Sequence, residues 1–257
     1  MTPSVHPTAV VDPAANVSDG AAVGPYTVIG GDVTIGPGTV IGAHVVLEGR
    51  TTIGADCVIG HGVVVGTPPQ DHKYRGEPTT VTIGDRTQLR EYVTVHRATG
   101  ARGETRIGAD CLLMAYVHVA HDCAIGDATV VANAVQLAGH VTIGHHVTIG
   151  GLTPIHQFVR IGDYAMIGGG SRVPTDIPPY ARAVGDPLRL FGVNGVGVTR
   201  AGIPAEERRA LAHAFRLLFN SARPRSDVLA ELADTRFGAV QELLTFLAGT
   251  ERGVLSA

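Results

Sequence analysis

The stretch VTIGHHVTIGGLTPIHQFVRIGDYAMIG, residues 141–168, decides the fold. An aliphatic residue returns at every sixth position in this stretch, and glycine often follows it. The same spacing runs from Val5 to Val173, where every sixth residue is Leu, Ile or Val except Asp71, Glu77 and Ala101. A period of six fits neither an α-helix nor a long alternating strand. It is typical of a short strand followed by a turn.

Three such units close one triangular coil, so one coil takes three periods of the repeat. A single coil cannot bury its own apolar edge, so neighbouring coils stack and share one core. By this stacking rule, residues three periods apart lie above one another at roughly one strand spacing, ~4.8 Å. The repeat therefore predicts an all-β fold, a parallel β-helix of hexapeptide repeats. The winding is left-handed in the families that carry this repeat, although the repeat itself does not fix the hand.

Two segments interrupt the period and divide the chain further. Residues 66–82 and 98–106 are rich in Pro, Gly and charge, which predicts loops that leave the coil and return in phase. We expect the β-helix to occupy residues 1–189, with prolines after Val173 marking a linker, and a small helical domain to occupy 190–257. Helices are predicted at 204–221, 226–234 and 237–249 from their apolar spacing.

Composition excludes several classes of protein. The chain has 257 residues, 34 of them Gly, no Trp and a net charge of −3, without a run of Lys or Arg for a nucleic-acid grip. No apolar run is long enough for a membrane span, and the N-terminus lacks the pattern of a secretory signal. Three cysteines fit a reducing cytoplasm, and all three fall at inward repeat positions, as small core residues.

The segment YVHVAHDC, residues 116–123, carries the candidate chemistry. The stacking rule places Gly139 and then Gln157 above His121. By the same rule, His140 lies above Asp122. His118 lies on the same coil as His121 and Asp122. We therefore predict one patch on a single edge of the prism, made of His121, Asp122, Gly139, His140, His156 and Gln157.

Three interpretations of this patch stay open. A His paired with a carboxylate is a general-base unit, and the bare N–H of Gly139 beside it would suit an oxyanion. Several His near an Asp could instead hold Zn²⁺. The residues could also only decorate a turn. Because a convex prism has no pocket of its own, the 66–82 loop, the helical domain or a neighbouring subunit must wall the patch, and a three-sided column suits a threefold homo-oligomer.

Seven stretches resemble a known family, and together they cover nearly the whole chain. They are QDHKYRGEPT (70–79), IGDRTQLREYVTVHRAT (83–99), LLMAYVHVAHDC (112–123), LAGHVTIG (137–144), HQFVRIG (156–162), DIPPYA (176–181) and FGVN (191–194). In these motifs the chain resembles the acyl-carrier-protein-dependent UDP-N-acetylglucosamine O-acyltransferases, which begin lipid A biosynthesis. The resemblance implies a homotrimer with active sites between subunits, no cofactor and no metal.

The resemblance also implies an activity and residue roles. An R-3-hydroxyacyl group would pass directly from acyl carrier protein to the 3-hydroxyl of UDP-N-acetylglucosamine, without an acyl-enzyme. His121 would be the general base, Asp122 its orienting partner and Gly139 the oxyanion donor. Gly169 would form the base of the acyl groove. The residues implied to contact substrate are Asp71, Lys73, His118, His140, His156, Gln157, Asn194 and Arg200.

The chain departs from the family near the nucleotide. Val196 and Ala201 stand where many members carry Glu and Arg. Six arginines between 200 and 225 against two glutamates give a local charge of +4, which is either a solvated helix face or a docking surface for the acidic carrier protein.

Two other activities stay open: acyl transfer to a 3-amino UDP-sugar, and a trimeric β-helix metalloenzyme of the carbonic anhydrase type. An inactive scaffold is the third alternative.

Overall fold

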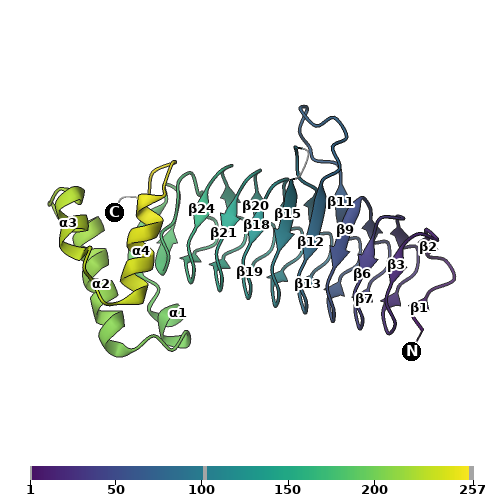
Figure 1. Cartoon of the computed structure of the whole chain (residues 1–257), viewed down its shortest axis with the longest axis horizontal. Helices are drawn as coiled ribbons and strands as arrows, with labels where there is room; N and C mark the ends of the chain where they lie inside the picture. Colours follow the sequence, from purple (N-terminus) through teal and green to yellow (C-terminus); the bar gives the residue numbers. More distant parts are fainter. Residues whose placement is uncertain (1, 101–102, 255–257) are drawn as a thin grey trace.

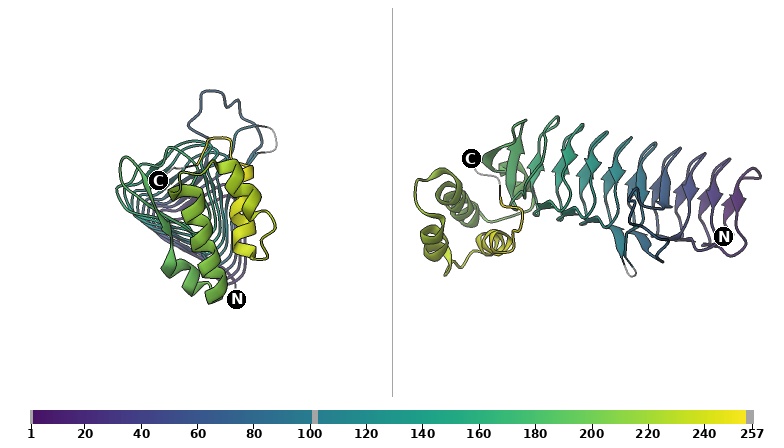
Figure 2. Two further views of the ribbon diagram at one scale, coloured as in Figure 1. Left: turned by 90° about the vertical axis from the view of Figure 1, so that its left-hand side faces the viewer. Right: turned by 90° about the horizontal axis from the view of Figure 1, so that it is seen from above.

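The computed structural model describes residues 2–100 and 103–254, which form an elongated column of stacked coils with helices at its C-terminal end (Figure 1). Viewed along its axis, the column has a triangular outline (Figure 2). Each coil contributes one short strand to each of three sheets, called here A, B and C. Among the described residues, no helix is long and apolar enough to cross a membrane.

The strands follow the order that the repeat predicts. Sheet A contains β1 (Ser4–Val5), β4 (Ala22–Val23), β7 (Val40–Ile41), β10 (Val58–Ile59), β13 (Gln88–Leu89), β16 (Leu112–Leu113), β19 (Val130–Val131), β22 (Thr148–Ile149), β25 (Met166–Ile167), β26 (Ala181–Val184) and β27 (Arg189–Val193). Sheet B contains β2 (Val10–Val11), β5 (Val28–Ile29), β8 (Val46–Leu47), β11 (Val64–Thr67), β14 (Thr94–His96), β17 (His118–Val119), β20 (Gln136–Leu137) and β23 (Pro154–Ile155). Sheet C contains β3 (Asn16–Val17), β6 (Thr34–Ile35), β9 (Arg50–Ile53), β12 (Thr80–Ile83), β15 (Glu104–Ile107), β18 (Ala124–Ile125), β21 (Thr142–Ile143) and β24 (Arg160–Ile161).

The register confirms the stacking rule. Leu113 pairs with Val131, and Leu137 pairs with Ile155, in each case three periods of the repeat further on. The aliphatic residues of the repeat are buried in one continuous core, and the three free cysteines are buried with them. Burial raises the pKa of the Cys123 thiol to about 12. The cysteines are therefore core residues rather than nucleophiles.

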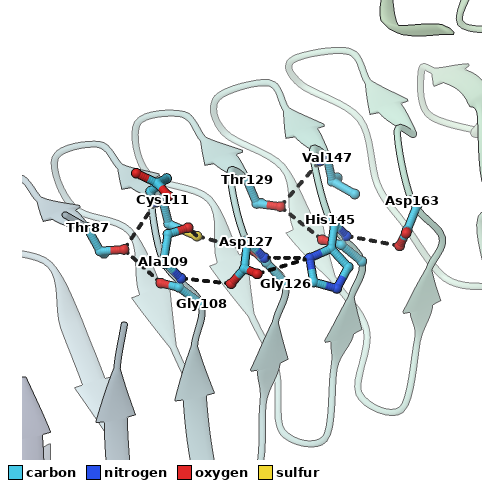
Figure 3. A network of polar contacts seen from close by, with 12 residues as sticks. Thr87, Gly108, Ala109, Cys111, Gly126, Asp127, Thr129, His145, Val147 and Asp163 are labelled. Atoms are coloured by element: carbon cyan, nitrogen blue, oxygen red, sulfur yellow. Dashed lines mark hydrogen bonds and ion pairs between the residues drawn. The ribbon is translucent and has the colours of Figure 1, made fainter. Parts of the chain in front are cut away.

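The three edges of the prism are named by the sheets that they join. At each edge a residue with positive φ turns the chain, and it is often not glycine, as at His146 (φ 56°) and Tyr164 (φ 57°) on the C–A edge. Polar side chains fasten successive coils along this edge (Figure 3). Asp127 Oδ1 accepts from the Ala109 N–H at 2.8 Å, and Thr129 Oγ1 donates to the Gly144 carbonyl at 2.9 Å.

Both predicted loops leave the column and return in phase. Ile59 pairs with Leu89, and Leu89 pairs with Leu113, so both of these steps are longer than three periods of the repeat. The extra length lies between β11 and β12, in residues 68–79, and between β14 and β15. The 68–79 segment projects from one side of the column (Figure 1). Ala101, one of the exceptions to the period, lies outside the described residues.

The prediction of a linker after Val173 is wrong. Ile177 forms a bridge with Ile161, and β26 pairs with β25 through Met166 and Arg182, so the chain completes another coil. The step from Met166 to Arg182 falls two positions short of three periods, which is why the period of six is lost. Strand β27 then returns antiparallel to β26.

The C-terminal helices are α1 (Gly195–Arg200), α2 (Ala205–Asn220), α3 (Arg225–Leu232) and α4 (Gly238–Ala248). The last three are the helices expected from the sequence. Leu211 and Phe215 of α2 and Leu243 of α4 are buried, so the apolar faces of these helices pack together. Helix α1 was not predicted because glycine and valine are poor helix formers; Asn194 caps it by accepting from the Gly197 N–H.

Candidate active site

A His–Asp pair lies at the B–C edge, in the turn between β17 and β18. His121 Nδ1 is 2.8 Å from Asp122 Oδ2, and the two side chains are only 16% and 15% exposed. Asp122 itself turns the chain with φ of 59°. Adjacent residues can share a hydrogen bond here because this backbone conformation points the carboxylate back toward the imidazole.

Thr99 completes the surroundings of the carboxylate. Asp122 Oδ2 accepts from the Thr99 N–H at 3.0 Å and from the Thr99 hydroxyl at 2.7 Å. Burial favours a raised pKa for Asp122, but the hydrogen bonds from Thr99 and His121 together outweigh it and lower that pKa. The carboxylate therefore stays ionised and accepts a hydrogen bond from Nδ1–H of His121. This hydrogen-bond network leaves the lone pair of Nε2 available as a base.

Gly139 lies directly against the imidazole, as the stacking rule predicts. A Cβ at Gly139 would lie 2.5 Å from Cε1 and 2.6 Å from Nε2 of His121. Any side chain at this position would displace the ring. Among the described residues, the Gly139 N–H donates no hydrogen bond, so it is free to bind a ligand oxygen beside Nε2.

His140 and Phe158 extend the same edge by two coils. The ring of His140 stacks on Phe158 at 4.6 Å and meets the ring of His121 edge-on at 5.0 Å. Nε2 of His140 is 3.9 Å from Asp122 Oδ2. Phe158 therefore fixes the orientation of His140 beside the His–Asp pair.

His118 is placed on β17 and is a neutral imidazole. Burial, with a smaller contribution from His96, lowers the pKa of His118 to about 4. Its Nδ1 lies 2.8 Å from the Thr94 hydroxyl, and its ring meets that of His96 edge-on at 5.3 Å. At neutral pH His118 can give or accept a hydrogen bond but carries no charge.

The 68–79 loop brings a second carboxylate toward this edge. Asp71 accepts from the Lys73 N–H at 2.9 Å, and this bond, followed by smaller contributions from the neighbouring His121 and Lys73, lowers the pKa of Asp71 against the opposing effect of burial. Asp71 therefore lies within electrostatic reach of His121. His156 and Gln157 lie exposed in the turn after β23, which stacks on β20 and so belongs to the same edge.

The remaining predicted residues lie elsewhere on this chain. Asn194 and Arg200 line a pocket of about 510 Å³ on the outer side of sheet A, together with His146, Tyr164 and Arg182. The side-chain amide of Asn194 is already used, since it donates to the Tyr164 carbonyl at 2.9 Å and caps α1. Gly169 is exposed in the turn after β25, which belongs to the A–B edge. One chain therefore does not unite these residues with His121.

His121, Asp122 and His140 are the described residues with metal-ligand spacing, since one ligand atom from each lies within 4.8 Å of the others. The hydrogen bonds weigh against a cation among them. Asp122 Oδ2 already accepts three donors, from Thr99 twice and from His121 Nδ1. A cation bound to these atoms would displace those bonds.

Sequence reasoning missed two members of this edge. Phe158 could have been found, because it lies one full coil beyond His140 and so falls on the predicted column. Thr99 could not, because it reaches Asp122 from an insertion whose length does not follow the repeat.

The fold and the edge site define a hexapeptide-repeat transferase. Residues 14–49 and 104–139 match the family described as bacterial transferase hexapeptide, and residues 176–255 match the second domain of UDP-N-acetylglucosamine O-acyltransferase. The acyl-[acyl-carrier-protein]–UDP-N-acetylglucosamine O-acyltransferase of Thiobacillus denitrificans is 46% identical over 98% of this chain and 99% of its own length. The chain belongs to this family of acyltransferases.

Solved structures agree over the whole length. The UDP-N-acetylglucosamine O-acyltransferase of Moraxella catarrhalis is 42% identical, with a TM-score of 0.93 over 99% of this chain and 100% of that chain. The UDP-N-acetylglucosamine acyltransferase of Campylobacter jejuni is 34% identical, with a TM-score of 0.93 over the same shares. The left-handed parallel β-helix with a C-terminal helical part is thereby confirmed.

Proposed function

We propose that this protein transfers an R-3-hydroxyacyl chain from acyl carrier protein to the 3-hydroxyl of UDP-N-acetylglucosamine, the first step of lipid A biosynthesis. The names of its relatives support the substrates. The 2.8 Å contact between His121 Nδ1 and Asp122 carries the mechanism, because it leaves Nε2 as the free base beside the N–H of Gly139.

The reaction follows from these groups. Nε2 of His121 removes the proton of the sugar hydroxyl as its oxygen attacks the thioester carbonyl, and Asp122 stabilises the resulting imidazolium. The Gly139 N–H stabilises the oxyanion of the tetrahedral intermediate. The C–S bond then breaks, and His121 returns the proton to the leaving thiolate. No acyl-enzyme is needed, and the buried Cys123 thiol is unsuited to form one.

We propose that the substrate lies along the B–C edge and the 68–79 loop. His118 is neutral and would hydrogen-bond the sugar without contributing charge. Lys73 would meet the diphosphate, while His156 and Gln157 extend the contact surface along the column. We also propose a cytoplasmic location, because three buried free thiols suit a reducing compartment.

The outer surfaces of the sheets support a trimer. Sheets A and B expose apolar side chains, such as Val40 (50% exposed) and Val10 (63%), and the edge between them exposes Tyr116 (60%) and Leu152 (72%). Sheet C instead exposes Thr52, Arg106 and Thr142. Three chains packed around their A–B edges would bury the apolar faces and leave sheet C in water.

This packing would also complete the site. Where sheet B of one subunit meets sheet A of the next, the B–C edge with His121 approaches the neighbour's C–A edge. The pocket containing Asn194 and Arg200 lies beside that edge. In this arrangement one subunit supplies the base and the next supplies the nucleotide pocket.

Mixed trimers test this arrangement. We expect His121→Ala and Arg200→Ala chains to be almost inactive alone. When they are refolded together, about a quarter of the sites would combine an intact His121 with a neighbour's intact Arg200, so activity should return to about that fraction. Activity that stays at the level of the separate variants would overturn a shared site.

The acceptor is tested separately. Wild-type protein is assayed with hydroxyacyl carrier proteins of different chain length, using UDP-N-acetylglucosamine and its 3-amino analogue in parallel. We expect the hydroxyl acceptor to be preferred. A preference for the amine would instead identify the 3-amino UDP-sugar as the acceptor. Because Gly169 adds no side chain to the groove, we expect the longer acyl chains to be the better donors.

A further inference from the structure

The two segments that leave the coils contact each other. Nε of Arg97 donates to the Tyr74 hydroxyl at 3.0 Å, and the guanidinium lies 5.5 Å from the centre of the Tyr74 ring. A second donor of Arg97 reaches the Gly66 carbonyl at 2.8 Å. Arg97 therefore ties the 68–79 loop to the column at the residue next to Lys73.

Two residues further along, the same segment holds the catalytic carboxylate. Thr99 donates twice to Asp122 Oδ2, from its N–H at 3.0 Å and from its hydroxyl at 2.7 Å. These are hydrogen bonds to an ionised acceptor, the stronger kind. With the bond from His121, they fix the carboxylate in one orientation and so fix which imidazole nitrogen carries the proton.

The segment itself is held in place. Ala98, between Arg97 and Thr99, is fully buried, and the Arg97 N–H donates to the Thr67 carbonyl at 3.1 Å. Gly103 permits the close approach, because a Cβ there would lie 2.8 Å from the Ala98 Cβ and 2.9 Å from Asp122 Oδ1. A displacement of this segment would therefore move both contacts.

We propose that the segment Arg97–Thr99 positions the two halves of the site: Thr99 fixes the Asp122–His121 pair, and Arg97 fixes the loop that carries Asp71 and Lys73. This inference rests on the proposed function, in which His121 is the base. Thr99 and Arg97 are positioning residues, since they act through Asp122 and through Tyr74.

The two contacts predict different kinetic signatures. Loss of the Thr99 hydroxyl leaves Asp122 a better acceptor for the imidazolium of His121, so the kinetic pKa of the base should rise. Two other ionisable groups face this pair, His140 from the next coil and Asp71 from the loop, and neither contacts Thr99. Loss of the Arg97 contacts should instead weaken substrate binding, because it leaves every hydrogen bond of the Asp122–His121 pair in place.

Thr99→Val tests the first contact, since valine keeps the shape and the backbone N–H. We expect kcat to fall about tenfold, KM for the UDP-sugar to stay nearly unchanged, and the acidic limb of the kcat profile to move to higher pH. Thr99→Ser should restore both the rate and the limb. Thr52→Val, at an exposed threonine of sheet C, is the matched control and should match the wild type.

Arg97→Met and Tyr74→Phe test the second contact. Each should raise KM for the UDP-sugar several-fold and move the acidic limb less than Thr99→Val does. The double variant should cost little more than either single change, because both remove the same hydrogen bond. Additive effects of the two substitutions would show that Arg97 does not act through Tyr74.

The His121→Ala variant distinguishes a failure of the positioning role from a failure of the proposed function. If His121→Ala is inactive while Thr99→Val keeps the wild-type rate and pH profile, the positioning role is wrong and the proposed base stands. If Thr99→Val lowers the rate equally at every pH and Thr99→Ser does not restore it, Thr99 has only a structural role. If His121→Ala stays active, the proposed function fails first.

Discussion

The B–C and C–A edges of the prism both carry a His–Asp pair, and they use it in opposite ways. At the B–C edge, Nδ1 of His121 donates to Asp122, and both side chains are largely buried. At the C–A edge, Nδ1 of His145 accepts from the Asp127 N–H at 3.0 Å, and the side chains are 53% and 49% exposed (Figure 3). One His–Asp pair thus leaves Nε2 free for the base that we propose, and the other fastens successive coils.

The difference comes from what surrounds the carboxylate and the second ring nitrogen. Thr99 holds Asp122 from an inserted segment, and Gly139 leaves room beside Nε2 of His121. In the part of the chain that the structure describes, Asp127 Oδ1 accepts instead from the Ala109 N–H of a regular coil. Residue identity alone therefore does not make the site; the insertion and the missing side chain do.

The largest effect should come from removing the two histidines in turn. His121→Ala is expected to lower kcat by at least about 100-fold, the contribution of a general base. His145→Ala should keep kcat within a few-fold and lower only the melting temperature. Turnover and thermal unfolding of both variants check this, and a His121→Ala enzyme that keeps more than about a tenth of the wild-type kcat contradicts the base.

The next effect concerns the space beside the base. Gly139→Ala puts a Cβ 2.5 Å from His121 Cε1, so the ring must move, and kcat should fall about 100-fold. Gly30→Ala is the matched control, because a Cβ there meets nothing closer than 3.6 Å. Circular dichroism should show both variants folded. Equal activity of the two would mean that the imidazole does not need its observed position.

The smallest expected effect tests the structural role of the C–A edge. Its stack of His146, Tyr164 and Tyr180 ends where the Tyr180 hydroxyl donates to Glu242 of α4. Burial raises the pKa of Glu242, so its charged form is disfavoured in the folded protein. The contribution of Glu242 to folding stability is therefore fully present below its pKa in the unfolded chain. It is lost as pH rises through its pKa in the folded protein.

Glu242→Gln keeps the acceptor for Tyr180 and removes that loss. Its melting temperature should exceed that of the wild type by roughly 1–3 °C at pH 8, and the difference should shrink toward pH 4. Thermal melts across this range check the sign. A difference that grows on acidification would mean that the ionised carboxylate is favoured in the fold.

The sequence predicted most of the column and part of the site, for one physical reason. Backbone hydrogen bonds keep successive coils three periods apart, so Gly139 and His140 could be placed against His121 and Asp122 by counting. Counting fails where the offset changes. The last coil is shorter by two positions, so its strands fall outside the period of six and its prolines suggested a linker. Thr99 reaches Asp122 from a segment outside the repeat.

The stacked coils also set a scale of length. His121 and Tyr164, which lines the Asn194 pocket, are separated by between two and three coils, roughly 11 Å along the axis. A relative with one more coil between them would separate His121 from the pocket by a further ~4.8 Å along the axis. This distance can therefore change only by whole coils. Under the function that we propose, the number of coils between the two positions predicts the length of the substrate that the enzyme binds.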